Sequence, residues 1–100
     1  MKPVVFHDGA VAELREASNW YERQRPGLGM EFRTAVQAAV SRIRQNPRSG
    51  ARFRDTRFRC LLVRRFPYVV FFAEGERVIR VLAVAHARRR PGYGTEREWG

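Results

Sequence analysis

Apolar residues recur with a helical period in two stretches of the first half of the chain. Between residues 10 and 21 they are spaced by four, three and four positions, at Ala10, Leu14, Ala17 and Tyr21. A longer stripe with steps of three and four runs through Phe32, Ala35, Val36, Ala39, Val40 and Ile43. This spacing places one apolar face on each of two helices. We predict an antiparallel helix hairpin whose two apolar faces need a sheet to cover.

Local signals set the ends of these helices. Asp8 precedes the first stripe and is predicted as its N-cap, because a carboxylate accepts hydrogen bonds from the first amides of a helix. Pro26 and Gly27 end that helix, since proline excludes the residue before it from helical backbone angles. Pro47 forbids continuation of the second helix beyond Asn46. Each helix is therefore bounded by a proline at its C-terminal side.

The second half of the chain has the pattern of strands. A short apolar run at residues 4–6 predicts a first strand, and residues 57–63, 68–73 and 78–86 predict three more. The run from Val78 to His86 is nearly unbroken in apolar residues, which is typical of a strand covered on both faces, so we predict it as the central strand. Residues 48–56 have no period and are predicted as a loop. The order β-α-α-β-β-β indicates an α+β fold in which the helix hairpin packs on a small, mainly antiparallel sheet.

Composition sets the size and compartment of this fold. A chain of 100 residues with 44% apolar content supports one core, so residues 1–100 are expected to form a single domain. Cys60 is the single cysteine and is expected to be a small core residue. The N-terminal apolar run is too short for a signal peptide, and no segment approaches the ~20 apolar residues of a membrane span. We expect a cytoplasmic protein that does not bind membranes.

The charge balance of the chain indicates the kind of partner it binds. The chain has 20 Lys and Arg against 10 Asp and Glu, a net charge of +10, and Lys2 is its only lysine. Arginine offers a planar fork that suits phosphate and carboxylate groups. This bias favours a nucleic-acid surface or an acidic protein partner.

The candidate site follows directly after the buried strand at residues 78–86. A histidine, three arginines and a tyrosine lie there within eight positions: His86, Arg88, Arg89, Arg90 and Tyr93. The meander of the last three strands brings a second basic pair toward them, Arg64 and Arg65. Glycine-rich phosphate loops, HExxH, CxxC and nucleophile-elbow motifs are missing from the sequence. We expect neither a metal nor a cofactor.

Two interpretations of this site stay open. Metal-independent RNA cleavage needs a base for the 2′-hydroxyl, an acid for the leaving oxygen and cations for the charged phosphorane. His86 or Tyr93 would supply the first two roles and the arginines the third. In the alternative, His86 is a hydrogen-bonded strand-end histidine, the arginines form a solvated face for an acidic partner, and Tyr93 pins the tail to the sheet. Trp20 and Tyr21 are expected in the core.

Several phrases of the sequence resemble a known family. They are residues 19–22, 26–29 and 65–68 and, above all, 84–93, which reads Val-Ala-His-Ala-Arg-Arg-Arg-Pro-Gly-Tyr. Together with the element order, they resemble the RelE/ParE superfamily of type II toxin-antitoxin toxins, also called plasmid stabilisation proteins. The likeness covers residues 4–93. It implies a toxin clasped in a hetero-oligomer by an acidic, partly extended segment of a cognate antitoxin.

The resemblance also implies one of two targets. RelE-like members cleave messenger RNA on the ribosome, whereas ParE-like members poison DNA gyrase. The C-terminal arginine and tyrosine of the RelE pattern fall on Arg89 and Tyr93, but its middle-strand arginine falls near Pro67, with Arg65 the closest substitute, and its lysines have no counterpart. Loss of a single oxyanion-type donor costs about 3 kcal/mol of transition-state stabilisation. We therefore expect a ParE-like gyrase inhibitor.

The sequence also allows two functions other than gyrase inhibition. One is a ribosome-dependent mRNA endoribonuclease with His86, Arg89 and Tyr93 as catalytic residues. The other is an interaction module without toxicity. In a ParE-like toxin the residues expected to bind the target or the antitoxin are Arg64, Arg65, Arg88, Arg89 and Arg90.

Overall fold

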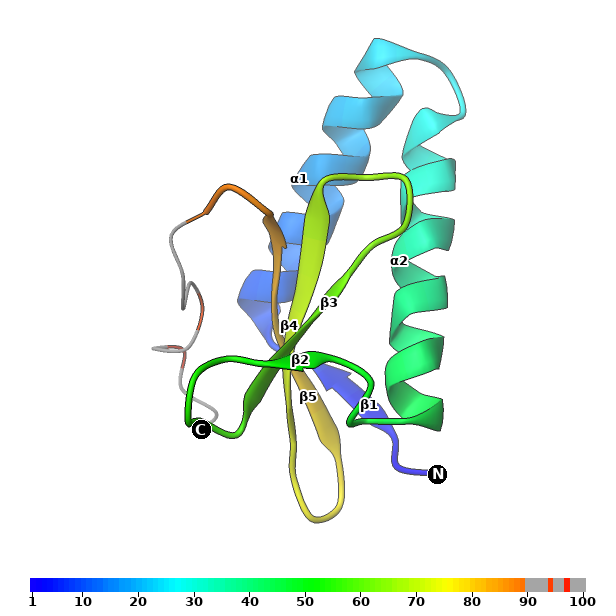
Figure 1. Ribbon diagram of the computed structural model, residues 1–100. Coiled ribbons are helices and arrows are strands. Elements are labelled where there is room, and N and C mark those ends of the chain that lie inside the picture. The colour runs from blue at the N-terminus through cyan, green and yellow to red at the C-terminus, as the bar shows by residue number, and fades with distance from the viewer. Residues whose placement is uncertain (90–93, 95–96, 98–100) are drawn as a thin grey trace.

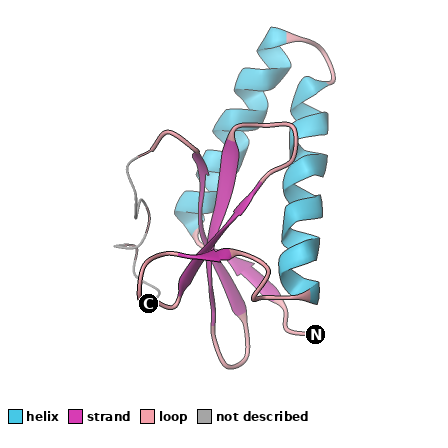
Figure 2. Cartoon of the chain, viewed as in Figure 1, coloured by secondary structure: helices cyan, strands magenta, loops and turns pink. Residues whose placement is uncertain are grey.

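Two helices lie side by side over one face of a five-stranded sheet (Figures 1 and 2). The computed structural model describes residues 1–89, 94 and 97. Its elements are β1 (Val4–Phe6), α1 (Asp8–Gln24), α2 (Leu28–Gln45), β2 (Ala51–Arg52), β3 (Phe58–Leu62), β4 (Tyr68–Glu74) and β5 (Ile79–His86). The predicted fold class and element order are confirmed, with the two-residue strand β2 added where a loop was expected.

The first helix is capped by the residue before the one predicted. His7 has an extended backbone, and its Nδ1 accepts a hydrogen bond from Gly9 N at 2.9 Å. Asp8 is already the first residue of α1, so its assignment as N-cap was wrong. Its carboxylate still lies in the first turn, where the partial positive charge of the helix N-terminus favours an acid.

The tight connection between the helices depends on one carboxylate and two glycines. Glu22 in the last turns of α1 accepts hydrogen bonds from Gly27 N and Gly29 N, both at 3.0 Å. Gly27 has φ 89°, a backbone angle that favours glycine. A Cβ on Gly29 would lie 2.6 Å from the carbonyl oxygen of Ser18. Any larger residue at position 29 would therefore push the two helices apart.

The sheet order is β1-β5-β4-β3-β2, so β4 is the middle strand and β5 is second. The prediction of β5 as central was therefore only partly right. β1 pairs in parallel with β5 over Ile79–Val81 and no further, while β4 pairs with β5 along its whole length. A bulge between Phe71 and Phe72 leaves Leu82 as the extra residue of β5. Beyond Val81, β5 thus has a strand partner on one side, in the part of the chain that the structure describes.

Most of the core lies between the helices and the sheet. Its largest fully buried side chains are Phe32, Phe72, Ile43, Ile79, Val63, Val70, Val81 and Val84. A smaller cluster on the other sheet face consists of Phe71, Ala73, Leu82 and Ala83, packed against Phe53, Phe58 and Cys60. Cys60, expected in the core, is half-buried at the margin of this second cluster, and burial raises the pKa of its thiol. The described helices include none that is long and apolar enough to cross a membrane.

Candidate interaction site at the end of β5

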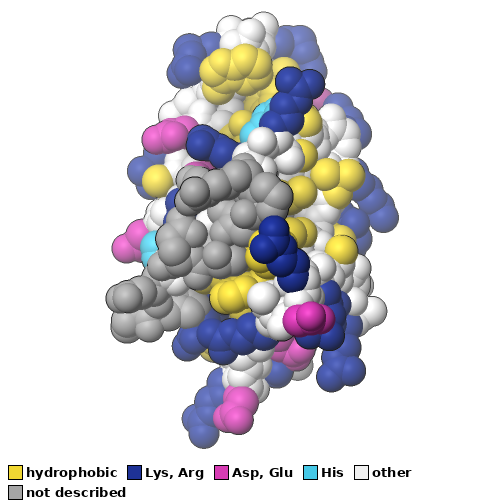
Figure 3. Space-filling view, turned by 60° about the vertical axis from the view of Figure 1, so that its left-hand side comes forward, with side chains coloured by type: hydrophobic (Ala, Val, Ile, Leu, Met, Phe, Trp, Pro, Cys, Tyr) yellow, Lys and Arg dark blue, Asp and Glu magenta, His cyan; other side chains and the backbone are white. Residues whose placement is uncertain are grey.

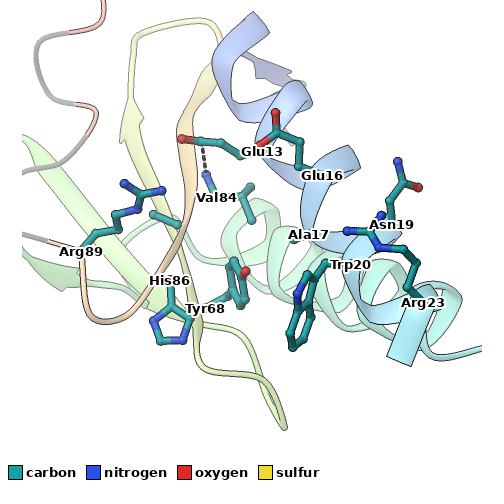
Figure 4. Close-up of a pocket in the computed structure, with 11 residues that line it drawn as sticks. Glu13, Glu16, Ala17, Asn19, Trp20, Arg23, Tyr68, Val84, His86 and Arg89 are labelled. Atoms are coloured by element: carbon teal, nitrogen blue, oxygen red, sulfur yellow. Dashed lines mark hydrogen bonds between the residues drawn. The ribbon is translucent and has the colours of Figure 1, made fainter. Parts of the chain in front are cut away.

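A groove of about 490 Å³ lies between α1 and the second half of β5 (Figure 4). It opens because β1 ends at Phe6, so that the rest of β5 has no strand on that side among the residues that the structure describes. One wall comes from α1 and consists of Glu13, Glu16, Ala17, Asn19, Trp20 and Arg23. The other comes from β4, β5 and the turn after it and consists of Tyr68, Val84, Ala85, His86 and Arg89.

At one end of the groove, two side chains form hydrogen bonds with backbone groups of β5 that a neighbouring strand would otherwise pair. Glu13 Oε1 accepts a hydrogen bond from Val84 N at 3.0 Å, drawn as a dashed line in Figure 4. Arg97 donates to both Glu13 oxygens, at 3.0 and 2.8 Å, and to Leu82 O at 2.7 Å. The Arg97 and Glu13 side chains are only 18% and 17% exposed. This ion pair closes the β5 edge at Leu82 and Val84.

The next backbone groups of β5 face the groove. Amide direction alternates along a strand. Because Val84 N points toward Glu13, His86 N two residues later points to the same side. Ala87 N instead donates to Pro67 O at 2.8 Å, on the β4 side. The alternation therefore directs the amide of His86 and the carbonyl of Val84 toward the groove.

Aromatic side chains form the opposite end of the groove. Tyr68 lies between His86 and Trp20 in Figure 4, with its ring centroid 5.4 Å from that of His86. Burial raises the pKa of Tyr68, and the positive charge of Arg89 partly opposes that rise. The Trp20 side chain is 51% exposed, so its expected place in the core was wrong. It lies one position before Tyr21 and therefore off the apolar stripe of α1, a signal that could have revealed it.

His86 is held by the turn that follows β5. Its Nδ1 accepts a hydrogen bond from Arg88 N at 3.1 Å, and its carbonyl accepts one from Arg89 N at 2.9 Å. Because Nδ1 is the acceptor, the neutral ring carries its proton on Nε2. In this tautomer Nε2 is a donor and the lone pair of Nδ1 is engaged by Arg88 N, which suits binding better than general-base chemistry. The same turn returns Arg89 to the groove.

The second predicted arginine pair, Arg64 and Arg65, lies on a turn next to the site, but neither guanidinium lines the groove. The backbone of the β3–β4 turn adjoins the end of β5, since Tyr68 is the cross-strand partner of His86. Arg65 Nη2, however, donates to Glu31 Oε1 on α2 at 2.9 Å. Arg64 is exposed at the same turn and does not line the groove. The guanidinium of Arg65 therefore points to α2 instead of joining Arg89.

The remaining predicted residues are placed as follows. Arg88 is exposed beside His86 and does not line the groove. Arg90 and Tyr93 lie outside the described residues. Among the residues that are described, His, Cys, Asp and Glu side chains make no group of three that could hold a metal ion. Of the predicted site residues, the structure thus unites His86 and Arg89 in one groove.

The groove combines groups that suit a peptide ligand. It combines an aromatic wall, backbone groups of a strand edge and the cations Arg23 and Arg89, while Glu13 and Glu16 add acidic groups near its closed end. Figure 3 shows Lys and Arg side chains at many places on the face it draws, with Asp and Glu side chains fewer and scattered. A partner with apolar and acidic residues would complement such a surface.

Comparison with known proteins identifies the family. A family model described as "ParE toxin of type II toxin-antitoxin system, parDE" matches residues 4–91. The fold is similar to a solved structure described as "Chromosomal ParDE TA system from P. aeruginosa", with a TM-score of 0.75 and 20% sequence identity over 86% of this chain and 96% of that one. No curated protein matches the sequence. Since the family model covers most of the chain, this protein belongs to the ParE toxin family of type II toxin-antitoxin systems.

Proposed function

We propose that this chain inhibits DNA gyrase and is neutralised by an antitoxin segment that binds in the groove between α1 and β5. The observation that carries the proposal is the groove itself, in which an exposed tryptophan, a strand edge and cations meet on a member of the ParE toxin family. Membership of the family supplies the toxin role. The groove supplies a place for the partner.

The chemistry of the groove defines the antitoxin segment that fits it. An apolar side chain packs between Trp20 and Tyr68, where an aromatic anchor contributes most of the binding energy in many interfaces. Backbone groups of the segment pair with His86 N and Val84 O, as in strand addition. Acidic side chains of the segment meet Arg23 and Arg89, which line the same groove. The partner is therefore a segment that is both acidic and apolar.

Three features favour a binding surface over an RNA-cleaving site. The neutral His86 ring carries its proton on Nε2, and the Arg65 guanidinium donates a hydrogen bond to Glu31. The middle-strand arginine of the RelE pattern falls near Pro67, and Arg65 is its closest substitute. The proximity of Tyr68, His86 and Arg89 keeps mRNA cleavage as the second candidate. In that alternative, His86 would accept the proton either at Nδ1, in place of the hydrogen bond from Arg88 N, or at Nε2 after a change of tautomer.

One induction experiment separates these functions. The chain is expressed in a bacterial host, and three quantities are followed: supercoiling of a reporter plasmid, covalent gyrase–DNA cleavage complexes, and transcript ends mapped by primer extension. We expect loss of supercoiling and accumulation of cleavage complexes, without codon-positioned transcript ends. Codon-positioned cuts with unchanged supercoiling would establish the nuclease instead. Growth without any of these effects would leave an interaction module.

Two variants connect the phenotype to the groove. Arg89→Ala removes a cation that lines it, and Arg77→Ala removes an exposed cation from the β4–β5 loop at the other end of β5. We expect Arg89→Ala to weaken neutralisation by the cognate antitoxin, and Arg77→Ala to leave it unchanged. Equal effects of the two substitutions would contradict a role for this groove.

A further inference from the structure

A second basic cluster lies at the opposite edge of the sheet from the groove. Arg48, Arg52, Arg57 and Arg59 line a surface hollow of about 400 Å³ together with Thr56 and Glu74. β2 is the last strand on that side, three strands away from β5 in the sheet order. None of these residues lines the groove. The cluster is therefore separate from the proposed antitoxin site.

The sheet brings two of these arginines face to face. Arg52 and Arg59 are direct partners in the antiparallel β2–β3 pair, so their side chains leave the same face. Like charges at directly opposed positions destabilise a sheet. Arg57, two positions before Arg59, adds a third cation to the hollow. Such an arrangement lowers local stability unless an anion lies between the guanidinium groups.

The guanidinium groups are oriented without being neutralised. Arg52 donates to the carbonyl oxygen of Thr56 at 3.4 and 3.2 Å, and Arg59 donates to that of Gly50 at 2.8 Å. A carbonyl oxygen fixes the direction of an arginine but leaves its charge in place. None of the four arginines forms an ion pair with a described residue. The cluster thus contains two arginines held by backbone carbonyls, Arg52 and Arg59, and two more cations that form no ion pair with a described residue.

The one carboxylate in the hollow is already engaged. Glu74 Oε2 accepts a hydrogen bond from Lys2 Nζ at 2.7 Å, and both side chains are 33% exposed. Its negative charge is therefore shared with a fifth cation. The hollow as a whole remains strongly positive.

Clustered arginines fit phosphate groups, because a phosphate can accept two hydrogen bonds from one guanidinium. The aromatic rings nearest in sequence, Phe53 and Phe58, pack against Phe71 at 5.7 Å in the cluster on the other sheet face. Aromatic side chains do not line the hollow. Single-stranded nucleic acids are usually bound by stacking their bases on such rings. A surface that contacts only the sugar-phosphate backbone of a nucleic acid instead matches the regularly spaced phosphates of a duplex.

We propose that Arg48, Arg52, Arg57 and Arg59 form a binding site for the phosphate backbone of duplex DNA. The site is independent of the proposed gyrase inhibition, and it would let the toxin contact DNA while the groove is occupied. It reads no bases, because it contacts phosphates alone. Binding is therefore independent of sequence and strongly dependent on salt.

The test is fluorescence anisotropy of the isolated chain with two labelled duplexes of unrelated sequence, titrated at several salt concentrations. Four neutralised phosphates give a slope of about −3.6 in log Kobs against log salt. The variant Arg52→Gln/Arg57→Gln should reduce the magnitude of that slope by about 1.8 and weaken binding to both duplexes equally. The single variant Arg57→Gln should reduce the magnitude of the slope by about 0.9. Unlike the Arg52 side chain, that of Arg57 forms no hydrogen bond with the described backbone of the hairpin, so a loss in this variant reports a lost phosphate contact and not a disturbed fold.

The matched control is Arg15→Gln/Arg33→Gln, which removes the same charge from exposed positions on α1 and α2. We expect the control to bind both duplexes with the slope of the unaltered chain. Equal losses in the two double variants would show that net charge alone attracts DNA and would overturn the site. A flat salt response would overturn it as well. Tighter binding of a single strand than of the duplex, lost in the same variants, would refute the duplex assignment.

Discussion

Replacing Glu13 by glutamine tests how the β5 edge is held. Glu13 links three segments, since it belongs to α1, accepts from Val84 N at 3.0 Å and pairs with Arg97 at 2.8 Å. The substitution Glu13→Gln preserves an oxygen for Val84 N and removes the charge that faces Arg97. Its effect therefore reports the ion pair rather than the backbone bond.

The expected magnitude follows from burial. Breaking a buried pair costs about 3–5 kcal/mol, whereas exposed pairs contribute about 0–1 kcal/mol. The two side chains are 17% and 18% exposed, and Arg97 retains its bond to Leu82 O at 2.7 Å. We therefore expect Glu13→Gln to lower the free energy of unfolding by about 2 kcal/mol, between these limits. In a chain of this size, that corresponds to a Tm lower by about 8–16 °C.

Urea unfolding of Glu13→Gln, Arg97→Met and the double variant measures the coupling directly. The neighbouring Glu16→Gln, exposed on the same helix, is the control and should leave stability unchanged. Hydrogen exchange at the Val84 amide adds a local readout, because Glu13→Ala removes its acceptor and should speed exchange. Single-variant losses below about 0.5 kcal/mol, or additive effects in the cycle, would refute the proposed role of the pair.

Three further outcomes are expected. Trp20→Ala should weaken antitoxin binding about 30-fold, as for an interface anchor worth about 2 kcal/mol, while Met30→Ala, an exposed apolar residue of α2 outside the groove, should not; isothermal titration would show both. Hydrogen bonds from Arg65, and to a smaller extent from Arg25, lower the pKa of Glu31. The two ion pairs of Glu31 therefore stabilise the fold above the carboxyl's unfolded pKa of about 4.3, and this contribution is lost as the pH falls through the lower folded pKa. Tm measured through this range should fall less steeply in Glu31→Gln, and an unchanged slope would contradict the link. Phe72→Ala, at a fully buried ring, should cost about 3–5 kcal/mol in urea unfolding, and a loss under 1 kcal/mol would show that the core is misassigned.

Periodic segments could be predicted because their periodicity reflects burial. The stripe through Phe32, Val36 and Ile43 specifies α2 without other information, and these side chains are indeed buried. The run before His86 likewise specifies β5. β2 was missed because it has only two residues, Ala51 and Arg52, both exposed. A strand without an apolar face leaves no hydrophobic pattern.

The site was harder to predict because it depends on pairing rather than on pattern. The sequence indicates that His86 and Arg89 follow a buried strand, and both line the groove. It does not indicate that β1 stops after three residues of pairing, which is what opens the groove. Nor does it show that Glu31 draws Arg65 away, since that contact joins residues 34 positions apart. Long-range contacts of this kind have no local signature.

The parallel pairing of β1 with β5 has a consequence for how the protein is made. Val4 pairs with Ile79, and the groove combines α1 with the turn after β5. A nascent chain therefore forms its helix hairpin early, while the sheet that covers the hairpin, and the groove itself, wait until β5 and the turn at Arg89 have left the ribosome. A chain that has not yet reached Arg89 cannot present this groove. On our proposal, the antitoxin meets its binding site only after β5 and the following turn have been made, so a product that stops before β5 would not be neutralised at this groove.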